Sequence, residues 1–450
     1  MLSDPIVALA TPPGRSALAV IRLSGAGAHD VAARCLQPFP GAPRTVVRSR
    51  LVHPASGEPI DAPLVARYAA PRSYTGEDMA EVFTHGGLLV PADGVAAFVA
   101  AGARPAEPGE FTRRAVANGK LDLLQAEATA DLIDAGSAAQ RRRALHQLDR
   151  GLSARLDELR AELLDLEALI AYDIDFPEED DGPVSPERVE RAWCVVRDRL
   201  ARLLATAPEG ERLREGALLV IAGPPNAGKS SLFNALLGRE RAIVTEVPGT
   251  TRDAIEAAAV LEGFPFRLVD TAGLRDSGDR VERLGIEVSR RYLGAADLIV
   301  FCEAGDEGGG TGDERGREAF LAACTAPVVR TRTKADLLPV PRPSSLVTVV
   351  SVVTGEGLDA LKRRLAEVAF AHLLAQGDVE PVVTRARHRL ALERALGEVE
   401  GFHAARARGV EAVAAATHLR AAVGALDDLI GVVAPDDILD RVFASFCVGK

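Results

Sequence analysis

The sequence predicts a multidomain fold that joins α/β domains to an all-α domain, and three observations predict it. Short apolar runs separated by Pro and Gly fill residues 1–118. An apolar run followed by a Gly-rich loop begins near residue 217, and stretches with helical spacing of apolar residues lie on both sides of it. The simplest architecture is an N-terminal α/β domain and a discontinuous helical domain into which a second α/β domain is inserted.

The helical domain is predicted from the two segments 119–215 and 376–450. Apolar positions from Leu145 to Ile170 recur every third or fourth residue and predict one long amphipathic helix. An acidic, Pro-rich loop follows, after which Pro186 is expected to open the next helix.

Composition bounds the class of protein. At 450 residues the chain has room for about three domains, and its 47% hydrophobic content supplies separate cores. The five cysteines form no C-x-x-C pair, so neither a disulfide framework nor a zinc ribbon is indicated, and a cytoplasmic location is expected. The sequence has no cationic leader and no apolar run near the ~18 residues that span a bilayer, so no membrane association is expected.

The net charge of −11 argues against indiscriminate binding of polyanions, but basic clusters occur in the helical segments. A solvated helix face is the commoner meaning of any one cluster, whereas several in one domain favour a surface that faces RNA. The clusters are Arg141-Arg142-Arg143 with His146, Arg385-x-Arg387-His388-Arg389, and Arg406-x-Arg408.

A Gly-rich loop follows directly on the apolar run 218–222 and has the sequence Gly223-Pro-Pro-Asn-Ala-Gly-Lys229-Ser230. In this strand, loop and helix context the pattern is a P-loop, and a chance match is the less favoured interpretation. Backbone N–H groups and the helix N-terminus bind phosphate there, Lys229 reaches the β- and γ-oxygens, and Ser230 takes a Mg²⁺ position. The sequence thus predicts an inserted Ras-like P-loop G domain over residues 216–375. Its expected phosphate contacts are Asn226, Ala227, Gly228, Lys229, Ser230 and Ser231.

Two further segments are expected near the γ-phosphate and Mg²⁺. An apolar strand ends at Asp270, at a position where G proteins have a carboxylate that binds Mg²⁺ through a coordinated water. Gly273 is expected to offer a backbone N–H to the γ-phosphate. Before this strand lies a loop whose residues Thr250 and Thr251 are expected to close over Mg²⁺ and the γ-phosphate. The residues between the carboxylate and the glycine, also expected on the nucleotide, are Thr271 and Ala272.

Guanine is predicted from the end of a later strand. Lys334 and Asp336 follow the apolar run 327–332. The Asp336 carboxylate can accept two hydrogen bonds, from the guanine N1–H and the exocyclic amine, which adenine lacks. Residues 351–357 are expected to close the base pocket, and the predicted ligand is therefore GTP.

These elements resemble the translation-factor-like G proteins, with two departures. Thr333 stands where Asn-Lys-x-Asp proteins have Asn, so guanine affinity is expected to be lower, while specificity survives through Asp336. Leu274 stands where Ras-like proteins have the Gln that orients water, and its apolar side chain cannot polarise water. Catalysis must therefore come from other residues.

Motifs outside the predicted G domain lie near both ends of the chain. They are Ala10-Thr-Pro-Pro-Gly-Arg15, Ser73-Tyr-Thr-Gly-Glu-Asp78 with Glu81, His85-Gly86-Gly87, Pro108-Gly-Glu-Phe-Thr112, Asn118-Gly-Lys-Leu-Asp-Leu-x-Gln-Ala-Glu127 and the terminal Ser445-Phe-Cys447-Val-Gly-Lys450. Together they resemble the bacterial tRNA-modification GTPases of the MnmE (TrmE) family, and the resemblance spans all three predicted domains.

The resemblance implies a GTPase that acts with an FAD- and NADH-using partner, MnmG (GidA), in a heterotetramer. The pair would add an aminomethyl-type group to C5 of the wobble uridine of certain tRNAs. It further implies a homodimer whose N-terminal domain, similar to folate-binding modules, holds a tetrahydrofolate derivative (5-formyl or 5,10-methylene). By position, the folate contacts of the family correspond to Arg22, Glu81 and Lys120, with Lys450 nearby.

The family also implies potassium. Asn226 occupies the P-loop position where potassium-activated G proteins have an Asn ligand for K⁺, although bracing of the loop is the alternative role. A monovalent cation there can replace an arginine finger, which is worth on the order of 10³ to 10⁵ in rate. Ser230 and Thr251 are the expected Mg²⁺ ligands. The loop that would wrap the nucleotide consists of Thr245, Glu246, Val247, Pro248, Gly249, Thr250 and Thr251, with K⁺ ligands near Thr245, Val247 and Thr250.

Three residues are candidates for the chemistry. Glu282 matches the glutamate of the family that orients the attacking water, and Arg275 is expected to hold it in place; an ordinary helical ion pair is the alternative for Glu282. Cys447 lies in a Gly-flanked tail, where a thiolate would act as a nucleophile if cations lower its pKa, or where it would simply pack beside Phe446.

Two other functions remain open at the level of sequence. A ribosome-assembly or regulatory GTPase would bind RNA without modifying it, but would not need a folate pocket or a terminal Cys-Val-Gly-Lys. A folate-dependent aminomethyltransferase with a vestigial G domain is opposed by the intact Lys229, Asp270 and Asp336.

Overall fold

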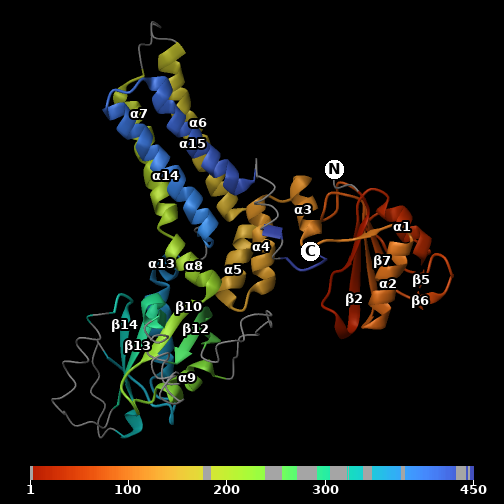
Figure 1. The fold of residues 1–450 in the computed structure, drawn as a ribbon, viewed down its shortest axis with the longest axis horizontal. Helices are drawn as coiled ribbons and strands as arrows, with labels where there is room; N and C mark the ends of the chain where they lie inside the picture. The colour runs from red at the N-terminus through yellow and green to blue at the C-terminus, as the bar shows by residue number, and fades with distance from the viewer. Residues whose placement is uncertain are drawn as a thin grey trace. The chain divides into compact units, whose positions relative to one another are not determined.

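The contacts within the computed structural model divide the chain into two compact units (Figure 1). One unit comprises Met1–Ala130 with Asp427–Lys450, and the other comprises Asp131–Leu426. The boundaries that the sequence suggests between its domains stay a prediction. The structure describes residues 4–175, 184–238, 256–270, 291–304, 322, 324–337, 347–376, 381–431, 442–443 and 446–449.

The first unit is built on a six-stranded sheet with the order β4-β7-β8-β2-β1-β9. Its strands are β1 (Ile6–Leu9), β2 (Gly14–Ser24), β4 (Val46–Arg48), β7 (Leu64–Tyr68), β8 (Met79–Gly87) and β9 (Arg104–Pro105). A small sheet of β3 (Leu36–Gln37), β5 (Arg50–Val52) and β6 (Pro59–Asp61) lies beside the helices α1 (Ala28–Cys35) and α2 (Leu89–Ala100). The unit also contains α3 (Glu110–Ala117) and most of α4 (Leu123–Asp134), whose last four residues belong to the second unit.

Side-chain alternation along β2 and β8 separates the two faces of this sheet. Ile21, Val65 and Val82 are buried in one core cluster with residues of α1 and α2. Their neighbours point to the other face, where Arg22 is paired in register with Glu81. The core therefore lies on one side, and a polar pair lies on the other.

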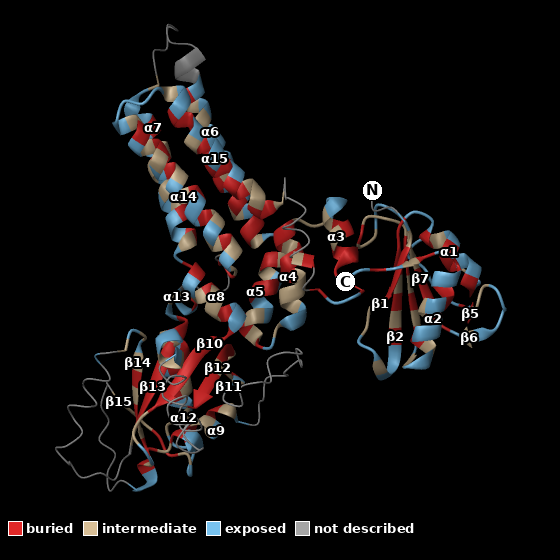
Figure 2. Cartoon of the chain, in the orientation of Figure 1, coloured by how far each residue is buried: buried red, intermediate tan, exposed pale blue. Residues whose placement is uncertain are grey.

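The second unit contains a six-stranded sheet with the order β11-β12-β10-β13-β14-β15, parallel except for β11. All six residues of β10 are buried, as expected for a central parallel strand covered on both faces, and the buried strands stand out in Figure 2. The strands are β10 (Ala217–Ala222), β11 (Glu256–Leu261), β12 (Phe264–Asp270), β13 (Leu298–Ala304), β14 (Val328–Thr333) and β15 (Val347–Val349).

Helices flank this sheet and form a bundle next to it (Figure 1). In the bundle the Trp193 indole N–H donates to the Val399 carbonyl at 2.9 Å, and its ring stacks on His403 at 3.9 Å. No described helix combines the length and apolar character that crossing a bilayer requires. The helices are α5 (Ala138–Leu148), α6 (Gly151–Asp175), α7 (Pro186–Leu204), α8 (Ala207–Glu215), α9 (Lys229–Leu237), α12 (Leu358–Ala369), α13 (Ala371–Gln376), α14 (Ala386–Ala407) and α15 (Ala412–Ile430), with a 3-10 turn at Ala335–Leu337.

The prediction of one helix from Leu145 to Ile170 is wrong, because the chain forms α5 and α6 with a break between them. Arg150 has a φ of 65°, a left-handed conformation that ends a helix. The apolar spacing continues across the break, so periodicity alone misses it. The predicted start at Pro186 is confirmed, and the Ser185 hydroxyl caps that helix by accepting from the Arg188 N–H.

Helix α8 is held against the segment that precedes α14. The Val383 N–H donates to the Thr206 hydroxyl at 3.0 Å. A Cβ on Gly210 would lie 2.0 Å from the Val383 carbonyl oxygen, so only glycine permits this approach.

We predict that Gly210→Ala lowers the free energy of unfolding of the second unit by about 1–3 kcal/mol, because the added methyl forces the backbones apart. Gly397→Ala is the matched control, since a Cβ at that position in α14 meets no atom within 4 Å. The control should instead stabilise the helix by about 0.5–1 kcal/mol. Urea unfolding followed by circular dichroism measures both, and equal effects would contradict the packing argument.

Candidate functional site

The predicted P-loop lies between β10 and α9, as the sequence indicates. Gly223 has a φ of 145°, and a Cβ there would lie 2.4 Å from the Cys302 carbonyl oxygen, so the loop leaves the sheet only with glycine at this position. Asn226 has a φ of 61°, which Asn tolerates better than most residues. Among the expected phosphate contacts, Ala227 and Lys229 are buried, while Asn226, Ser230 and Ser231 are exposed.

Lys229 and Asp270 flank the mouth of this loop. The Lys229 ammonium donates to the Pro224 carbonyl at 2.7 Å, so it lies over the loop that would hold phosphate. Asp270 ends β12 and is paired in register with Ile221, the penultimate residue of β10. Its side chain is largely buried.

Thr333 ties the end of β14 to the P-loop. Its hydroxyl is buried and donates to the Ala227 carbonyl at 2.7 Å, with the Glu303 carbonyl at 3.2 Å. The sequence predicted a weaker role for Thr333, because its side chain is shorter than that of the usual Asn. In the structure the Thr333 hydroxyl nevertheless reaches the P-loop directly. Lys334 follows with a φ of 57°, which turns the chain toward Asp336.

Asp336 is oriented by the segment that was expected to close the base pocket. The Ser351 hydroxyl donates to Asp336 Oδ1 at 2.6 Å, and the Ala335 N–H donates to the Val350 carbonyl at 3.1 Å. The second carboxylate oxygen of Asp336 has no hydrogen-bond partner among the described residues. The carboxylate therefore keeps an oxygen for a ligand.

Many of the predicted site residues lie outside the described part of the chain, so their positions are not part of this geometry. They are Thr245, Glu246, Val247, Pro248, Gly249, Thr250, Thr251, Thr271, Ala272, Gly273, Arg275, Glu282 and Lys450.

A second polar site lies on the first unit, where the structure brings Arg22 and Glu81 together. Arg22 Nε and Nη2 donate to Glu81 Oε1 at 3.0 and 2.8 Å, and Arg22 Nη1 donates to the Gly449 carbonyl at 3.2 Å. The C-terminal tail thus reaches this pair, one residue before Lys450. One carboxylate oxygen of Glu81 is therefore already bonded to Arg22. The sequence alone did not predict this ion pair.

Aromatic residues that the sequence did not single out surround this pair. The Arg22 guanidinium lies 5.3 Å from the Tyr74 ring and 5.7 Å from the Phe111 ring, and the Tyr68 hydroxyl donates to Glu81 Oε2 at 3.3 Å. Burial raises the pKa of Tyr68, and the Glu81 charge adds to this. Tyr74 belongs to the Ser73–Asp78 motif. Its position in that motif could have identified it as a candidate residue of this site.

Lys120 and Cys447 lie at the margins of this second site. The Lys120 ammonium donates to the Pro71 carbonyl at 3.2 Å and is exposed. Cys447 is exposed, whereas its neighbour Phe446 is buried against Phe443. By contrast, burial raises the pKa of Cys302 to about 12, so that thiol stays protonated and inert.

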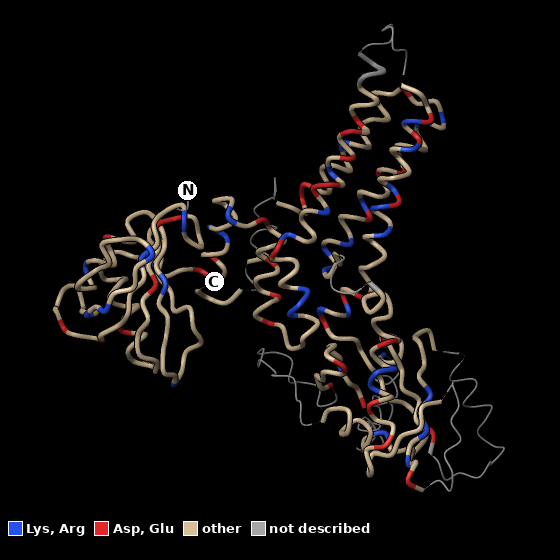
Figure 3. The backbone as a smooth tube through the Cα atoms, turned by 180° about the vertical axis from the view of Figure 1, so that it is seen from behind, with Lys and Arg blue, Asp and Glu red and all other residues tan. Residues whose placement is uncertain are grey.

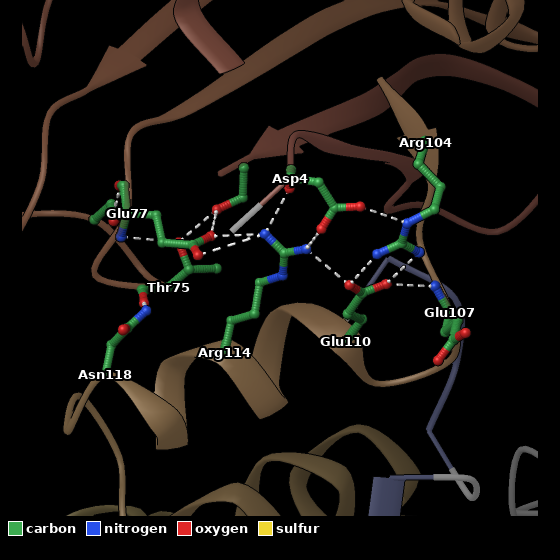
Figure 4. Close-up of polar contacts among 10 residues, drawn as sticks. Asp4, Thr75, Glu77, Arg104, Glu107, Glu110, Arg114 and Asn118 are labelled. Atoms are coloured by element: carbon green, nitrogen blue, oxygen red, sulfur yellow. Dashed lines mark hydrogen bonds and ion pairs between the residues drawn. The ribbon is translucent and has the colours of Figure 1, made fainter. Parts of the chain in front are cut away.

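A buried ionic network supports the loop that carries Tyr74 (Figure 4). Arg114 is 1% exposed and donates to Glu77 at 3.2 Å, to Glu110 at 2.9 Å and to the Asp4 carbonyl at 2.8 Å. Burial alone would raise the pKa of Glu110, but hydrogen bonds from Arg104 and from backbone and Arg114 donors lower it below its usual value. The network fixes the loop against α3 and the N-terminal segment.

The basic clusters of the helical segments are largely used within the second unit. Arg385 pairs with Asp131 at 2.7 Å, Arg389 bonds Glu211 at 2.9 Å, and Arg143 is buried. Acidic and basic residues also alternate along the long helices (Figure 3). These guanidinium groups therefore stabilise the unit, and the expected RNA-facing surface is reduced to exposed residues such as Arg141 and Arg408.

Comparison with protein families agrees with this geometry. A family described as the MnmE helical domain matches residues 123–447, and one described as the GTP-binding protein TrmE N-terminus matches residues 5–120. The chain belongs to the MnmE family of tRNA modification GTPases. Its N-terminal α/β, helical and G-domain architecture is the one that the sequence predicts for this family.

Relatives in the family match over their full length. The tRNA modification GTPase MnmE of Gluconacetobacter diazotrophicus is 43% identical over 451 residues, covering 99% of each chain. That of Moorella thermoacetica is 40% identical over 467 residues, covering 100% of both. Among solved structures, the G domain of the T. maritima FeoB iron transporter is 27% identical, with a TM-score of 0.24, and covers 34% of this chain and 98% of that chain.

We predict that Asp336→Asn shifts nucleotide preference from GTP to xanthosine triphosphate, because the Asn amide donates to the xanthine 2-oxo group where Asp only accepts. Competition titrations with both nucleotides measure the shift. Asp359→Asn, a change at an exposed carboxylate of α12, is the control and should leave the preference unchanged. An unaltered guanine preference in Asp336→Asn would remove this residue from base recognition.

Proposed function

We propose that this chain hydrolyses GTP and uses the cycle to modify tRNA, adding an aminomethyl-type group to C5 of the wobble uridine. An FAD-dependent partner of the MnmG (GidA) type would take part, with tRNA as the substrate. The observation that carries the proposal is the meeting of the P-loop, Asp270, Thr333 and the Asp336–Ser351 pair around one edge of a parallel sheet. Support comes as well from the full-length relatives named as tRNA modification GTPases.

The nucleotide would bind through groups that the described residues already orient. Lys229 would exchange its bond to Pro224 for β- and γ-phosphate oxygens, and the N-terminus of α9 adds positive potential. Asp336 would accept from guanine through the oxygen that Ser351 leaves free. Thr333 would keep the P-loop and the base site at a constant separation.

Ser230 and Asp270 fit a Mg²⁺ site, because a hydroxyl and a largely buried carboxylate are hard oxygen donors at the mouth of the loop. Asn226, exposed on the P-loop, fits a monovalent cation, and K⁺ is the proposed ion. These ions would supply positive charge next to the phosphates. The further ligands that we propose are Thr251 for Mg²⁺ and Thr245, Val247 and Thr250 for K⁺. Glu282 is proposed to orient the water, and Arg275 to hold Glu282 in place.

A tetrahydrofolate derivative is the proposed ligand of the first unit. Glu81 partly neutralises Arg22, and the Arg22 guanidinium lies next to two aromatic rings. The rings suit a flat, polar heterocycle, and the positive charge suits the acidic tail of such a ligand. Lys120 and Lys450 are proposed to bind its carboxylates. Cys447, exposed in the same tail, is proposed as a nucleophile in the modification.

A homodimer formed through the first unit is also proposed. Leu18, Val46 and Leu64 are exposed by 61%, 60% and 49% on β2, β4 and β7. Their strand registers put them on the sheet face that carries Arg22 and Glu81. A second copy would cover this apolar surface and border the folate site. The proposed domain limits remain 1–118, 119–215, 216–375 and 376–450, and the proposed location is the cytoplasm.

A regulatory or ribosome-assembly GTPase is the competing function. Such a GTPase would use the same G domain. Its function would give no role to the Arg22–Glu81 pair or to the C-terminal segment that contacts Arg22. Binding of tetrahydrofolate therefore distinguishes the two functions.

We predict that hydrolysis depends on K⁺ because Leu274 leaves no intrinsic glutamine to orient water. Replacing K⁺ by Na⁺ at constant ionic strength should slow turnover strongly, given that such charge compensation is worth on the order of 10³ to 10⁵ in rate. Asn226→Ala should erase the difference between the two salts, whereas Asn234→Ala, an exposed asparagine of α9, should preserve it. Glu282→Ala should lower turnover and spare GTP binding. Equal rates of the unaltered protein in both salts would contradict the cation mechanism.

We predict that Arg22→Met weakens 5-formyltetrahydrofolate binding about tenfold or more, because a charge-assisted hydrogen-bond donor is lost. Glu81→Gln should weaken it less, and Arg50→Met, at an exposed arginine of β5, should not change it. Calorimetry of the full chain measures each affinity, and an unchanged circular dichroism spectrum and melting curve show that the variants fold. Wild-type folate affinity in folded Arg22→Met would rule out this site.

A further inference from the structure

A cavity of about 610 Å³ lies within the second unit, away from the P-loop and the base site. It is lined by the C-terminal ends of α4 and α8, by α5, by the middle of β12 and by the segment that precedes α14. Its volume lies in the range of small-molecule sites. Neither GTP chemistry nor the proposed folate chemistry gives this cavity a role.

The cationic groups that line the cavity are already paired. Arg214 donates to Asp131 at 3.2 Å, and Arg385 nearby donates to the same carboxylate at 2.7 Å. Arg267 donates to the Gly216 carbonyl at 3.2 Å and to Glu256 at 3.3 Å. An anionic ligand would have to break these contacts.

Three of the acceptors that line the cavity have, by contrast, no hydrogen-bond donor among the described residues. Within the described part of the chain, Asp134 and Glu215 make no hydrogen bond or ion pair. Thr384 is 8% exposed, and its hydroxyl likewise has no partner among the described residues. Burial raises the pKa of Asp134 and the charge of Asp131 adds to this, while the charges of Arg214 and Arg385 oppose it. Arginine charges therefore act on Asp134, but no described group donates a hydrogen bond to it.

Helix ends add negative potential at both carboxylates. Asp134 is the last residue of α4 and Glu215 is the last residue of α8, so each carboxylate adds to the negative end of a helix dipole. Gln140 joins the two ends, since its amide donates to the Arg214 carbonyl at 3.0 Å and accepts from the Gly136 N–H at 3.0 Å. Two separate anionic positions thus face one cavity, whose apolar wall includes Leu213 and Ala144.

We propose that this cavity binds a linear aliphatic diamine or polyamine. Its ammonium groups would pair with Asp134 and Glu215, an N–H would donate to the Thr384 hydroxyl, and its methylene chain would pack on Leu213 and Ala144. A single metal ion fits less well, because the two carboxylates come from different helices and no metal-binding group of three His, Cys, Asp or Glu side chains occurs among the described residues.

The position of the site links the helical bundle to the G domain. Glu215 directly precedes Gly216 and β10, which leads to the P-loop, and Arg267 lies in β12, which ends at Asp270. A bound amine would therefore touch the segments that lead to both phosphate-binding elements.

Calorimetry of the full-length, nucleotide-free protein with putrescine and with spermidine at about 0.15 M salt tests the proposal. We expect saturable binding at one site per chain, with n-butylamine at least about tenfold weaker because it has one ammonium group. Asp134→Asn and Glu215→Gln should each weaken putrescine binding about tenfold or more, and Thr384→Val should weaken it less. Glu158→Gln, at an exposed carboxylate of α6 outside the cavity, is the matched control and should bind as the unaltered chain does.

The variants remove carboxylates that make no hydrogen bond or ion pair among the described residues, so their melting temperatures should change little, which a melting curve checks. Weakened binding in Asp134→Asn and Glu215→Gln with normal melting supports the site. The proposal is overturned if neither amine binds saturably, if both cavity variants bind like the unaltered chain, or if Glu158→Gln weakens binding equally, since that would indicate non-specific attraction to an acidic protein.

Discussion

The second unit depends on the hydrogen bonds and packing of one short helix, α8, whose end continues into the central strand β10. Its Arg212 donates to Asp297 Oδ1 at 2.8 Å, while Asp297 Oδ2 accepts from the Leu218 N–H at 2.9 Å, so one carboxylate bonds both α8 and β10. Glu209 accepts from the first N–H groups of α13 at 3.0 and 2.8 Å. Because these contacts are partly buried and charge-assisted, the strand that carries the P-loop cannot shift without disturbing the helices.

The same rigidity explains how a site can form at the edge of the sheet. Parallel strands bring the P-loop, Asp270 and Thr333 to one edge, and the Thr333 hydroxyl joins two of these elements directly. In the first unit, a buried arginine has the corresponding role, since Arg114 holds the loop of Tyr74 against α3. Both sites therefore rest on buried polar contacts, which hold the backbone around them in place before any ligand arrives.

Sequence patterns accounted for the G-domain strands and most helices because those patterns are local. The apolar run of β10, the glycines of the loop and the Ser-Pro start of α7 act over a few residues, and each appears where expected. The break at Arg150 escaped because the apolar spacing continues across it, and a left-handed residue leaves no signal in periodicity. The partners of the basic clusters escaped for a related reason: Asp131 and Glu211 lie far from Arg385 and Arg389 in the chain.

By itself, the sequence determined the chemical groups of this protein: a phosphate-binding loop with Lys229 and Ser230, a base-reading Asp336, and an Arg22, Glu81 and tail set near the two ends of the chain. Only the tertiary structure decided which of these groups are already engaged. It showed that Glu81 bonds Arg22, that Thr333 reaches Ala227, and that Asp134 and Glu215 face one cavity without a hydrogen-bond donor in the described part of the chain. The physical reason is that residue type sets what a side chain can bind, whereas burial and long-range packing decide which partner it meets.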